Sequence, residues 1–296
     1  MKDPSKGTDA NGRVEARPSR WGNRLVRRFS KSRSGMIGLA LVLGTLIIAI
    51  FAGSLSPFSY SKIVTEPMLS PNLKHLFGTD QFGRDYLSRI IFGSRVSIIV
   101  AILSQLVAVL IGIPIGALSG YLGGKIDNFI MRVVDVFLAF PFYLLAIVLV
   151  AVLGPSLQNV VIALGVVMWP AMARLVRGQT LSIREEEYVA AARVIGGSKH
   201  YIILRHVIPN CLAPVIIQVS LNMASAILGE AGLSFLGLGI QPPTPSWGQL
   251  LGFGKDYLRI APHLCIFPGL SIMIVVLGFN LLGDGLRDTL DPRLKG

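Results

Sequence analysis

Residues 96–118 read VSIIVAILSQLVAVLIGIPIGAL, an apolar stretch without a charged residue. A helix needs about 20 such residues to cross the hydrocarbon core of a bilayer. Five other stretches have a similar character and lie at residues 36–53, 133–153, 157–173, 212–228 and 264–282. The sequence therefore predicts an all-α, polytopic membrane protein with six transmembrane helices.

The composition of the whole chain supports the same fold class. Of its 296 residues, 52% are hydrophobic and 15% are charged, whereas an average soluble domain contains about 25% charged residues. This balance excludes a disordered or collagen-like chain. Cys211 and Cys265 form no C-x-x-C motif, so neither a disulfide framework nor a thiolate metal site is expected.

The distribution of positive charge predicts the orientation of the spans. The chain has 28 Lys and Arg against 16 Asp and Glu, which gives a net charge of +12. If both termini are cytoplasmic, 21 of the 28 basic residues lie on the cytoplasmic side, in agreement with the positive-inside rule. The basic balance then requires no nucleic-acid partner. A basic segment this long, followed by five more spans, argues against a cleaved signal peptide.

Residues 1–34 are expected to form a cytoplasmic basic tail. Trp21, Leu25 and Phe29 recur at helical spacing between arginines. This pattern predicts an interfacial helix whose arginines meet anionic membrane lipid. The alternative is a plain basic flank of the first span.

Residues 35–94 are expected to hold the first transmembrane helix and an extracytoplasmic segment. From Asp80 onward the segment has the pattern of an amphipathic helix on the outer surface. Two i, i+4 ion pairs of favourable orientation, Asp80/Arg84 and Asp85/Arg89, support this prediction.

The largest internal connection, at residues 174–209, has the pattern of two short helices. Three glutamates at residues 185–187 open the first helix, where acidic side chains suit the positive end of the helix dipole. Gly196 and Gly197 end it, and Ser198 caps a second helix that is expected to stop near Pro209. One face of the first helix carries a stripe of apolar and small residues, namely Tyr188, Ala191, Ala192 and Ile195. This stripe is equally suited to docking in a groove of a partner protein and to packing on the chain's own helix ends.

This loop resembles a known family. Its segment Ala190-Ala191-Ala192-x3-Gly196, with Pro209 further on, resembles the "EAA" loop of permease subunits of ATP-binding-cassette (ABC) importers. In that family the loop is the coupling helix that fits the ATPase subunit. The family's leading Glu is Ala190 here, and its Leu before Pro is Ile208. We hypothesise that Glu187 supplies the charged contact instead. The implied ATPase contacts are Glu187, Tyr188, Ala190, Ala191, Ala192, Ile195, Gly196 and Pro209.

Three further motifs sharpen the resemblance. They are GTDxxGRD at residues 78–85, SFLGLGxQPPxPxWG at residues 234–248 and FNLLGDGLRDxLDPR at residues 279–293. Together they resemble the second, "C"-type, permease of the branch that serves dipeptides, oligopeptides and nickel. The resemblance implies a type I ABC importer architecture. Its core transmembrane permease domain spans residues 95–284 and its cytoplasmic coupling loop residues 177–209, and residues 285–296 form a cytoplasmic tail.

The resemblance also implies an assembly in the bacterial cytoplasmic (inner) membrane. The chain forms half of a translocation pathway, and its partners are a homologous permease subunit, two ATP-binding subunits and an extracytoplasmic solute-binding protein. ATP and Mg bind to the partner subunits, so this chain is expected to hold no cofactor and no catalytic residue. Peptides are the expected solute, with nickel or another metal chelate as the alternative.

Polar residues within the fifth span predict part of the pathway. Gln218, Asn222 and Ser225 share one face of a helix, and polar side chains in a span avoid lipid. Helix–helix hydrogen bonding is the alternative explanation for this face. Glu230 lies at the outer end of the same span, where it either meets a substrate ammonium group or forms a structural hydrogen bond.

The outer loop after the fifth span contains Pro243, Pro245 and Trp247. The resemblance implies that this loop docks the solute-binding protein, and the alternative is a loop pinned to the membrane interface by the tryptophan. In the third span Asp135 is expected to pair with Arg132, three residues earlier. The four histidines have no helical ligand spacing, so no metal site is expected.

Two other classes of membrane protein compete with this interpretation. A secondary transporter driven by an ion gradient needs acidic or unwound sites in both halves of the chain, and only Asp135 and Glu230 are candidates. A membrane-embedded enzyme needs a nucleophile–base pair or a metal cluster at membrane depth, and none is visible. Gly124-Lys125 lacks the other residues of a phosphate-binding loop, so an ATP site is expected on another subunit.

Overall fold

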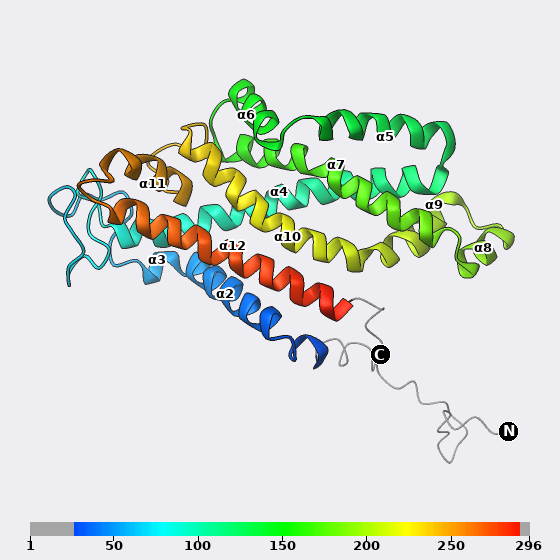
Figure 1. Ribbon diagram of the computed structural model, residues 1–296, viewed down its shortest axis with the longest axis horizontal. Helices are drawn as coiled ribbons and strands as arrows, with labels where there is room; N and C mark the ends of the chain where they lie inside the picture. The colour runs from blue at the N-terminus through cyan, green and yellow to red at the C-terminus, as the bar shows by residue number, and fades with distance from the viewer. Residues whose placement is uncertain (1–26, 291–296) are drawn as a thin grey trace, which may run out of the picture.

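The computed structural model describes residues 27–290 as an elongated bundle of helices (Figure 1). Trp21 and Leu25 of the expected interfacial helix lie outside these residues. The elements are α2 (Arg33–Ile50), α3 (Ala52–Leu55), α4 (Tyr86–Leu122), α5 (Gly124–Ala139), α6 (Phe142–Leu153), α7 (Leu157–Ile183), α8 (Glu187–Val194), α9 (Lys199–Ile202), a π-helical turn (Ile203–Val207), α10 (Ile208–Phe235), α11 (Trp247–Gly254), a 3₁₀ turn (Lys255–Tyr257) and α12 (His263–Leu290).

These helices provide up to six candidate membrane crossings. Five are long and apolar enough to span a bilayer, namely α2, α4, α7, the continuous helix from α9 to α10, and α12. The sixth is the pair α5 and α6, which is bent by 90° between the two helices. Pro141 caps α6 at this bend, and a proline disfavours helical backbone at the residue before it. The all-α, six-span prediction is confirmed, with a broken third span.

The prediction of an amphipathic outer helix that begins at Asp80 is wrong. The chain is irregular up to Asp85, whose side chain accepts a hydrogen bond from the Ser88 amide and caps α4. From there α4 continues without a break through the second span. The Asp80/Arg84 pair exists at 2.7 Å, within a turn rather than a helix. Asp85 pairs with His75 at 2.9 Å instead of with Arg89.

Three helices extend beyond their expected ends. The second helix of the large loop does not stop at Pro209, because the π-helical turn Ile203–Val207 joins α9 to α10 and this proline lies at the second position of α10, inside a continuous helix. At the start of the same loop α7 continues to Ile183, and near the C-terminus α12 continues to Leu290. The segments expected on the cytoplasmic side are therefore largely helical extensions of the spans.

Close helix pairs hold the bundle together. α4 packs along α7, and α12 packs between α2 and α10. At Gly38 of α2 an added Cβ atom would lie 2.3 Å from the Leu282 amide nitrogen and 2.7 Å from the Gly278 carbonyl oxygen of α12. Only glycine permits this approach, as is common where membrane helices pack through small residues.

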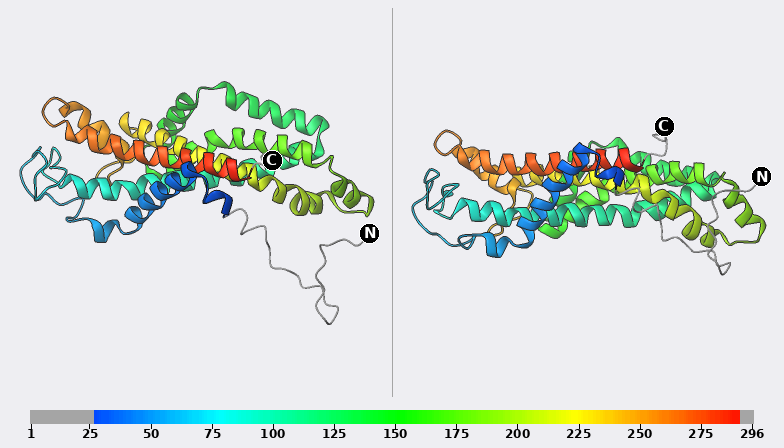
Figure 2. Two further views of the ribbon diagram at one scale, coloured as in Figure 1. Left: turned by 60° about the horizontal axis from the view of Figure 1, so that its bottom comes forward. Right: turned by 90° about the horizontal axis from the view of Figure 1, so that it is seen from below.

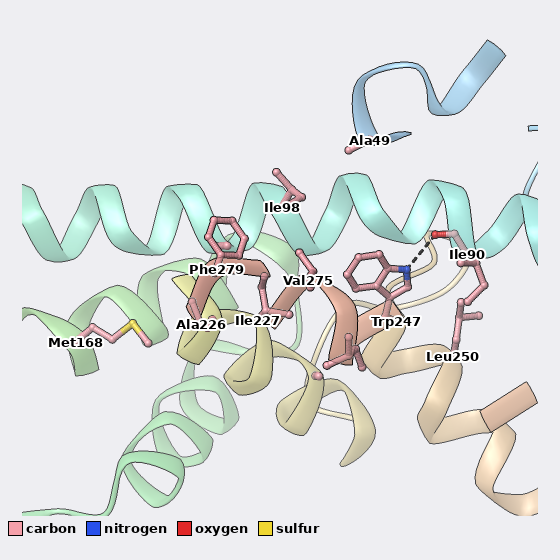
Figure 3. Packing of buried hydrophobic residues seen from close by; sticks show 14 of the residues in the cluster. Ala49, Ile90, Ile98, Met168, Ala226, Ile227, Trp247, Leu250, Val275 and Phe279 are labelled. Carbon is pink, nitrogen blue, oxygen red and sulfur yellow. Dashed lines mark hydrogen bonds between the residues drawn. The ribbon is translucent and has the colours of Figure 1, made fainter. Parts of the chain in front are cut away.

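The outer half of the core surrounds Trp247. Its indole Nε1 donates a 3.0 Å hydrogen bond to the Ile90 carbonyl of α4, next to Ile227 of α10 and Val275 of α12 (Figure 3). The indole is 3% exposed. Three helices and α11 are therefore joined at one point.

The two ends of the bundle are formed by different elements. α8 projects at one end, and the start of α2 and the end of α12 lie toward the same end (Figures 1 and 2). α11 and the irregular segment that precedes α4 lie at the opposite end. An even number of crossings is consistent with this arrangement.

Candidate functional site

α8 is a short helix that projects beyond the ends of the spans. It begins after Glu186 and ends at Ile195, and Gly196 adopts a φ of +87° that reverses the chain. Ser198 then caps α9, where its hydroxyl accepts a 3.3 Å hydrogen bond from the Tyr201 amide. The predicted two-helix pattern, with its glycine break and serine cap, is confirmed in this part of the loop.

One residue of α8 anchors it to the bundle. Val189 is 0% exposed and packs with Val176 of α7, Ile202 and Val207. Ala192 is half-buried on the same side. The alternative expectation, that this helix packs on the chain's own helix ends, therefore holds for this inner face alone.

The outer face of α8 is largely open, and Tyr188 has the His206 ring as a neighbour, with ring centres 6.2 Å apart. Ile195 is 85% exposed and Tyr188 is 43% exposed. Burial against the chain, and then the Glu186 carboxylate, raise the pKa of Tyr188, so its hydroxyl stays neutral. The other exposed residues expected to contact an ATPase are Glu187, Ala190, Ala191, Gly196 and Pro209.

Two arginines tether α8 to the turn between α4 and α5. Arg184 donates a 3.2 Å hydrogen bond to the Gly120 carbonyl. Arg193 donates a 2.5 Å hydrogen bond to the Arg184 carbonyl, and its guanidinium lies 5.7 Å from the ring centre of Tyr121. The hydrogen bond from Arg184 also lowers the pKa of Glu185. Arg193 thus links α8 to the end of α7 and to Tyr121 of α4, and Arg184 links the end of α7 to the last turn of α4.

A second tether lies one turn deeper in the bundle. Asp127 of α5 accepts two hydrogen bonds from Arg177 of α7, at 2.5 and 2.6 Å, and a third at 2.5 Å from the Ser119 hydroxyl of α4. Sequence reasoning missed this group, because its members are far apart in the chain. The only signal available in the sequence was Asp127 itself, an isolated acidic residue near the start of an apolar span.

The predicted polar face of α10 borders an open groove. Gln218 donates a 2.8 Å hydrogen bond to the Asn222 carbonyl oxygen, and Ser225 is exposed. The groove has a volume of about 680 Å³ and lies between α7, α10 and α12. Its polar lining residues are Gln179, Asn210, Gln218 and Arg287. The face thus combines a hydrogen bond within the helix with access to this groove.

Glu230 lies apart from that face. It is 0% exposed, and its Oε1 accepts a 2.7 Å hydrogen bond from Ser234 one turn along α10. Its Oε2 has no partner among the described residues. In this conformation the carboxyl group is sealed inside the chain, which fits the structural hydrogen bond rather than contact with a solute.

The outer loop is only partly available for docking. Pro243 is exposed, whereas Pro245 and Trp247 are buried. The tryptophan was expected to anchor the membrane interface or to contact a binding protein, and both expectations are wrong because its indole fills the core. Its sequence position beside a proline-rich loop gave no sign of this burial.

The expected local pair of Asp135 with Arg132 is also wrong. Asp135 instead pairs with Arg174 of α7. Among the described residues no group of three or more His, Cys, Asp or Glu side chains is placed to hold a metal ion.

Comparison with known proteins places this geometry in a family. Residues 112–296 match the family model described as the binding-protein-dependent transport system inner membrane component. Residues 19–73 match the N-terminal TM domain of oligopeptide transport permease C. The first match covers more than half of the chain.

Two curated relatives span nearly the whole chain. The dipeptide transport system permease protein DppC of Alkalihalophilus pseudofirmus is 46% identical over 272 residues, which cover 91% of this chain and 89% of the relative. The glutathione transport system permease protein GsiD of Escherichia coli is 42% identical, with coverages of 91% and 90%.

A solved structure has a similar fold. The inward-facing MetNI methionine ABC transporter aligns with a TM-score of 0.57 and 19% identity, and the alignment covers 68% of this chain and 96% of that chain. At this identity the likeness concerns the fold alone. Taken with the family models and the curated relatives, it establishes that the chain belongs to the family of binding-protein-dependent transport system inner membrane components, as a multi-pass permease of the oligopeptide C type.

Proposed function

We propose that this chain is one of two permease subunits of an ATP-driven peptide importer in the bacterial cytoplasmic membrane, with both termini in the cytoplasm. The observation that carries the proposal is the outer face of α8. Tyr188 and Ile195 are exposed there on a helix that is anchored from behind by Val189. Exposed apolar residues on a rigid support are typical of a surface that docks into another protein.

The partner on α8 is an ATP-binding subunit. ATP and Mg bind to a pair of such subunits, and this chain carries out no covalent chemistry. Closure of the ATPase pair moves α8, and the tethers through Arg184 and Arg193 transmit this movement to the α4–α5 turn. The spans then tip between inward-facing and outward-facing arrangements, which is a population shift driven by the nucleotide.

Peptide is the proposed solute. The two curated relatives are named as permeases for a dipeptide and for glutathione, which is itself a peptide. The Gln218–Asn222 amide pair beside the groove suits backbone amides, since a peptide that leaves water needs replacement hydrogen bonds. A homologous permease completes the pathway, and a solute-binding protein docks at the end that contains Pro243 and α11.

Two experiments test the proposal. The first is affinity purification of the tagged chain from membranes, where an ATPase should co-purify and the Glu187→Lys variant should weaken its retention. The second is dipeptide uptake into vesicles supplied with ATP and an uncoupler, in parallel with nickel uptake. Dipeptide uptake that persists with the uncoupler supports ATP-driven import. Uptake that collapses with the proton gradient, or that occurs with nickel alone, contradicts it.

A further inference from the structure

α5 presents three faces along its length. Its buried face packs on α4 and α7 and includes Asp127 and Val134. An apolar stripe is exposed beside it, and a polar stripe is exposed next to the apolar one. The apolar stripe consists of Ile126, Phe129, Val133, Val136 and Phe140. The polar stripe consists of Lys125, Asn128, Arg132 and Asp135.

Two exposed stripes of opposite character need two different surroundings. An apolar stripe is stable against lipid or against a second membrane protein, whereas charged side chains within a membrane bundle face water or protein. The rotation of α5 about its axis is fixed by the Asp127–Arg177 ion pair and by the contact of Phe137 with Trp169, whose ring centres are 5.5 Å apart. The polar stripe therefore keeps one direction, and it requires water or a polar partner beside it.

The Asp135–Arg174 pair lies on that polar side. The two side chains are 55% and 52% exposed, and neither makes another hydrogen bond or ion pair within residues 27–290. The Asp127–Arg177 pair nearby is much less exposed, at 10% and 30%, and the Ser119 hydroxyl also binds it. The largely buried Asp127–Arg177 pair thus holds α5 in place, whereas the exposed Asp135–Arg174 pair contributes little to the position of α5.

We propose that Asp135 and Arg174 form an exchangeable recognition site for zwitterionic peptides in the translocation pathway. The peptide carboxylate takes the place of Asp135 on Arg174, and the peptide ammonium takes the place of Arg174 on Asp135. Every charge remains paired during this exchange, so no charge is stranded at membrane depth. Since exposed ion pairs are weak, the site binds with a Kd on the order of millimolar and releases its ligand readily.

This inference rests on the proposed function, because it names how the imported peptide is recognised along the pathway. Neighbouring groups suit the same ligand. Arg132, one turn from Asp135 on the polar stripe, adds positive charge near the carboxylate position. α7 lies between α5 and α10 (Figure 1). The Asp135–Arg174 pair and the Gln218 amide therefore lie beside the same helix.

The test uses a thiol probe on the intact transporter. In a Cys211→Ala/Cys265→Ala background, Ala139→Cys places a thiol one turn from Asp135 on the polar side, and Val136→Cys places one on the apolar stripe. Both positions are exposed in this chain. The purified complex, without nucleotide or binding protein, is treated with a charged, water-soluble alkylating reagent. The Ala139→Cys thiol should react rapidly and the Val136→Cys thiol slowly.

Dialanine at about twice its dissociation constant should then slow alkylation of the Ala139→Cys thiol about threefold. N-acetyl-dialanine amide, which has no charged terminus, should give no protection. Adding Asp135→Asn or Arg174→Gln should abolish protection, while co-purification of the ATPase shows that these variants still assemble. Equal protection by the uncharged analogue, protection that survives both substitutions, or an unreactive Ala139→Cys thiol overturns the inference.

The failure of this inference is distinguishable from the failure of the proposed function. If the unmodified complex takes up dialanine with ATP but the probe shows no charge-dependent protection, only the Asp135–Arg174 site is refuted. If the unmodified complex takes up no peptide at all, the proposed function itself is refuted.

Discussion

The exposed end of α8 permits a quantitative test of the ATPase contact. Ile195 is 85% exposed and makes no core contact within the described chain, so Ile195→Ala should change the free energy of unfolding by less than about 0.5 kcal/mol. If the side chain is buried in the complex, the substitution removes three carbons from a desolvated contact. At about 0.8 kcal/mol per methylene, the loss is about 2.4 kcal/mol, or about 50-fold in Kd.

The assay is the affinity of the purified permease pair for its ATPase, with ATPase activity and peptide uptake measured in the same preparation. Val189→Ala is the matched control, because Val189 lies on the same helix but is 0% exposed. It should lower the free energy of unfolding by about 2 kcal/mol through lost burial and a cavity. An Ile195→Ala permease that binds the ATPase as tightly as the unmodified protein refutes the assignment of this face.

Three other predictions concern packing and transmission. Gly38→Leu should destabilise the chain by about 3 kcal/mol or more, because its Cβ meets the α12 backbone at 2.3 Å, whereas Gly44→Leu, with nothing within 4 Å, should leave the melting temperature unchanged. Trp247→Phe should cost about 1–2 kcal/mol in thermal unfolding, since it removes the indole hydrogen bond to the Ile90 carbonyl and leaves a gap in the core; an unchanged melting temperature contradicts this role. Arg193→Ala should preserve ATPase binding but lower the peptide transported per ATP hydrolysed, because it removes the tether to Tyr121. An unchanged transport ratio shows that the tether transmits nothing.

The local pattern of the large loop before α10 was predictable because its signals act over a few residues. Gly196 permits the left-handed backbone that ends α8, and the Ser198 hydroxyl caps the next helix. The division of α8 between an anchored and an open face was not predictable. It depends on whether Val189 meets α7, and helical periodicity gives the direction of a side chain but not the position of its neighbour.

The sequence by itself determined the all-helical, multi-span character of the chain and the placement of the start of α2 and the end of α12 toward one end of the bundle. These properties follow from the length of apolar runs and the position of basic residues, which the bilayer selects without reference to tertiary contacts. Only the tertiary structure decided the partners of individual polar groups. Asp135 pairs with Arg174 rather than Arg132, and Trp247 fills the core rather than facing the membrane interface. Such pairings depend on which helices lie side by side, and no spacing along one helix encodes that.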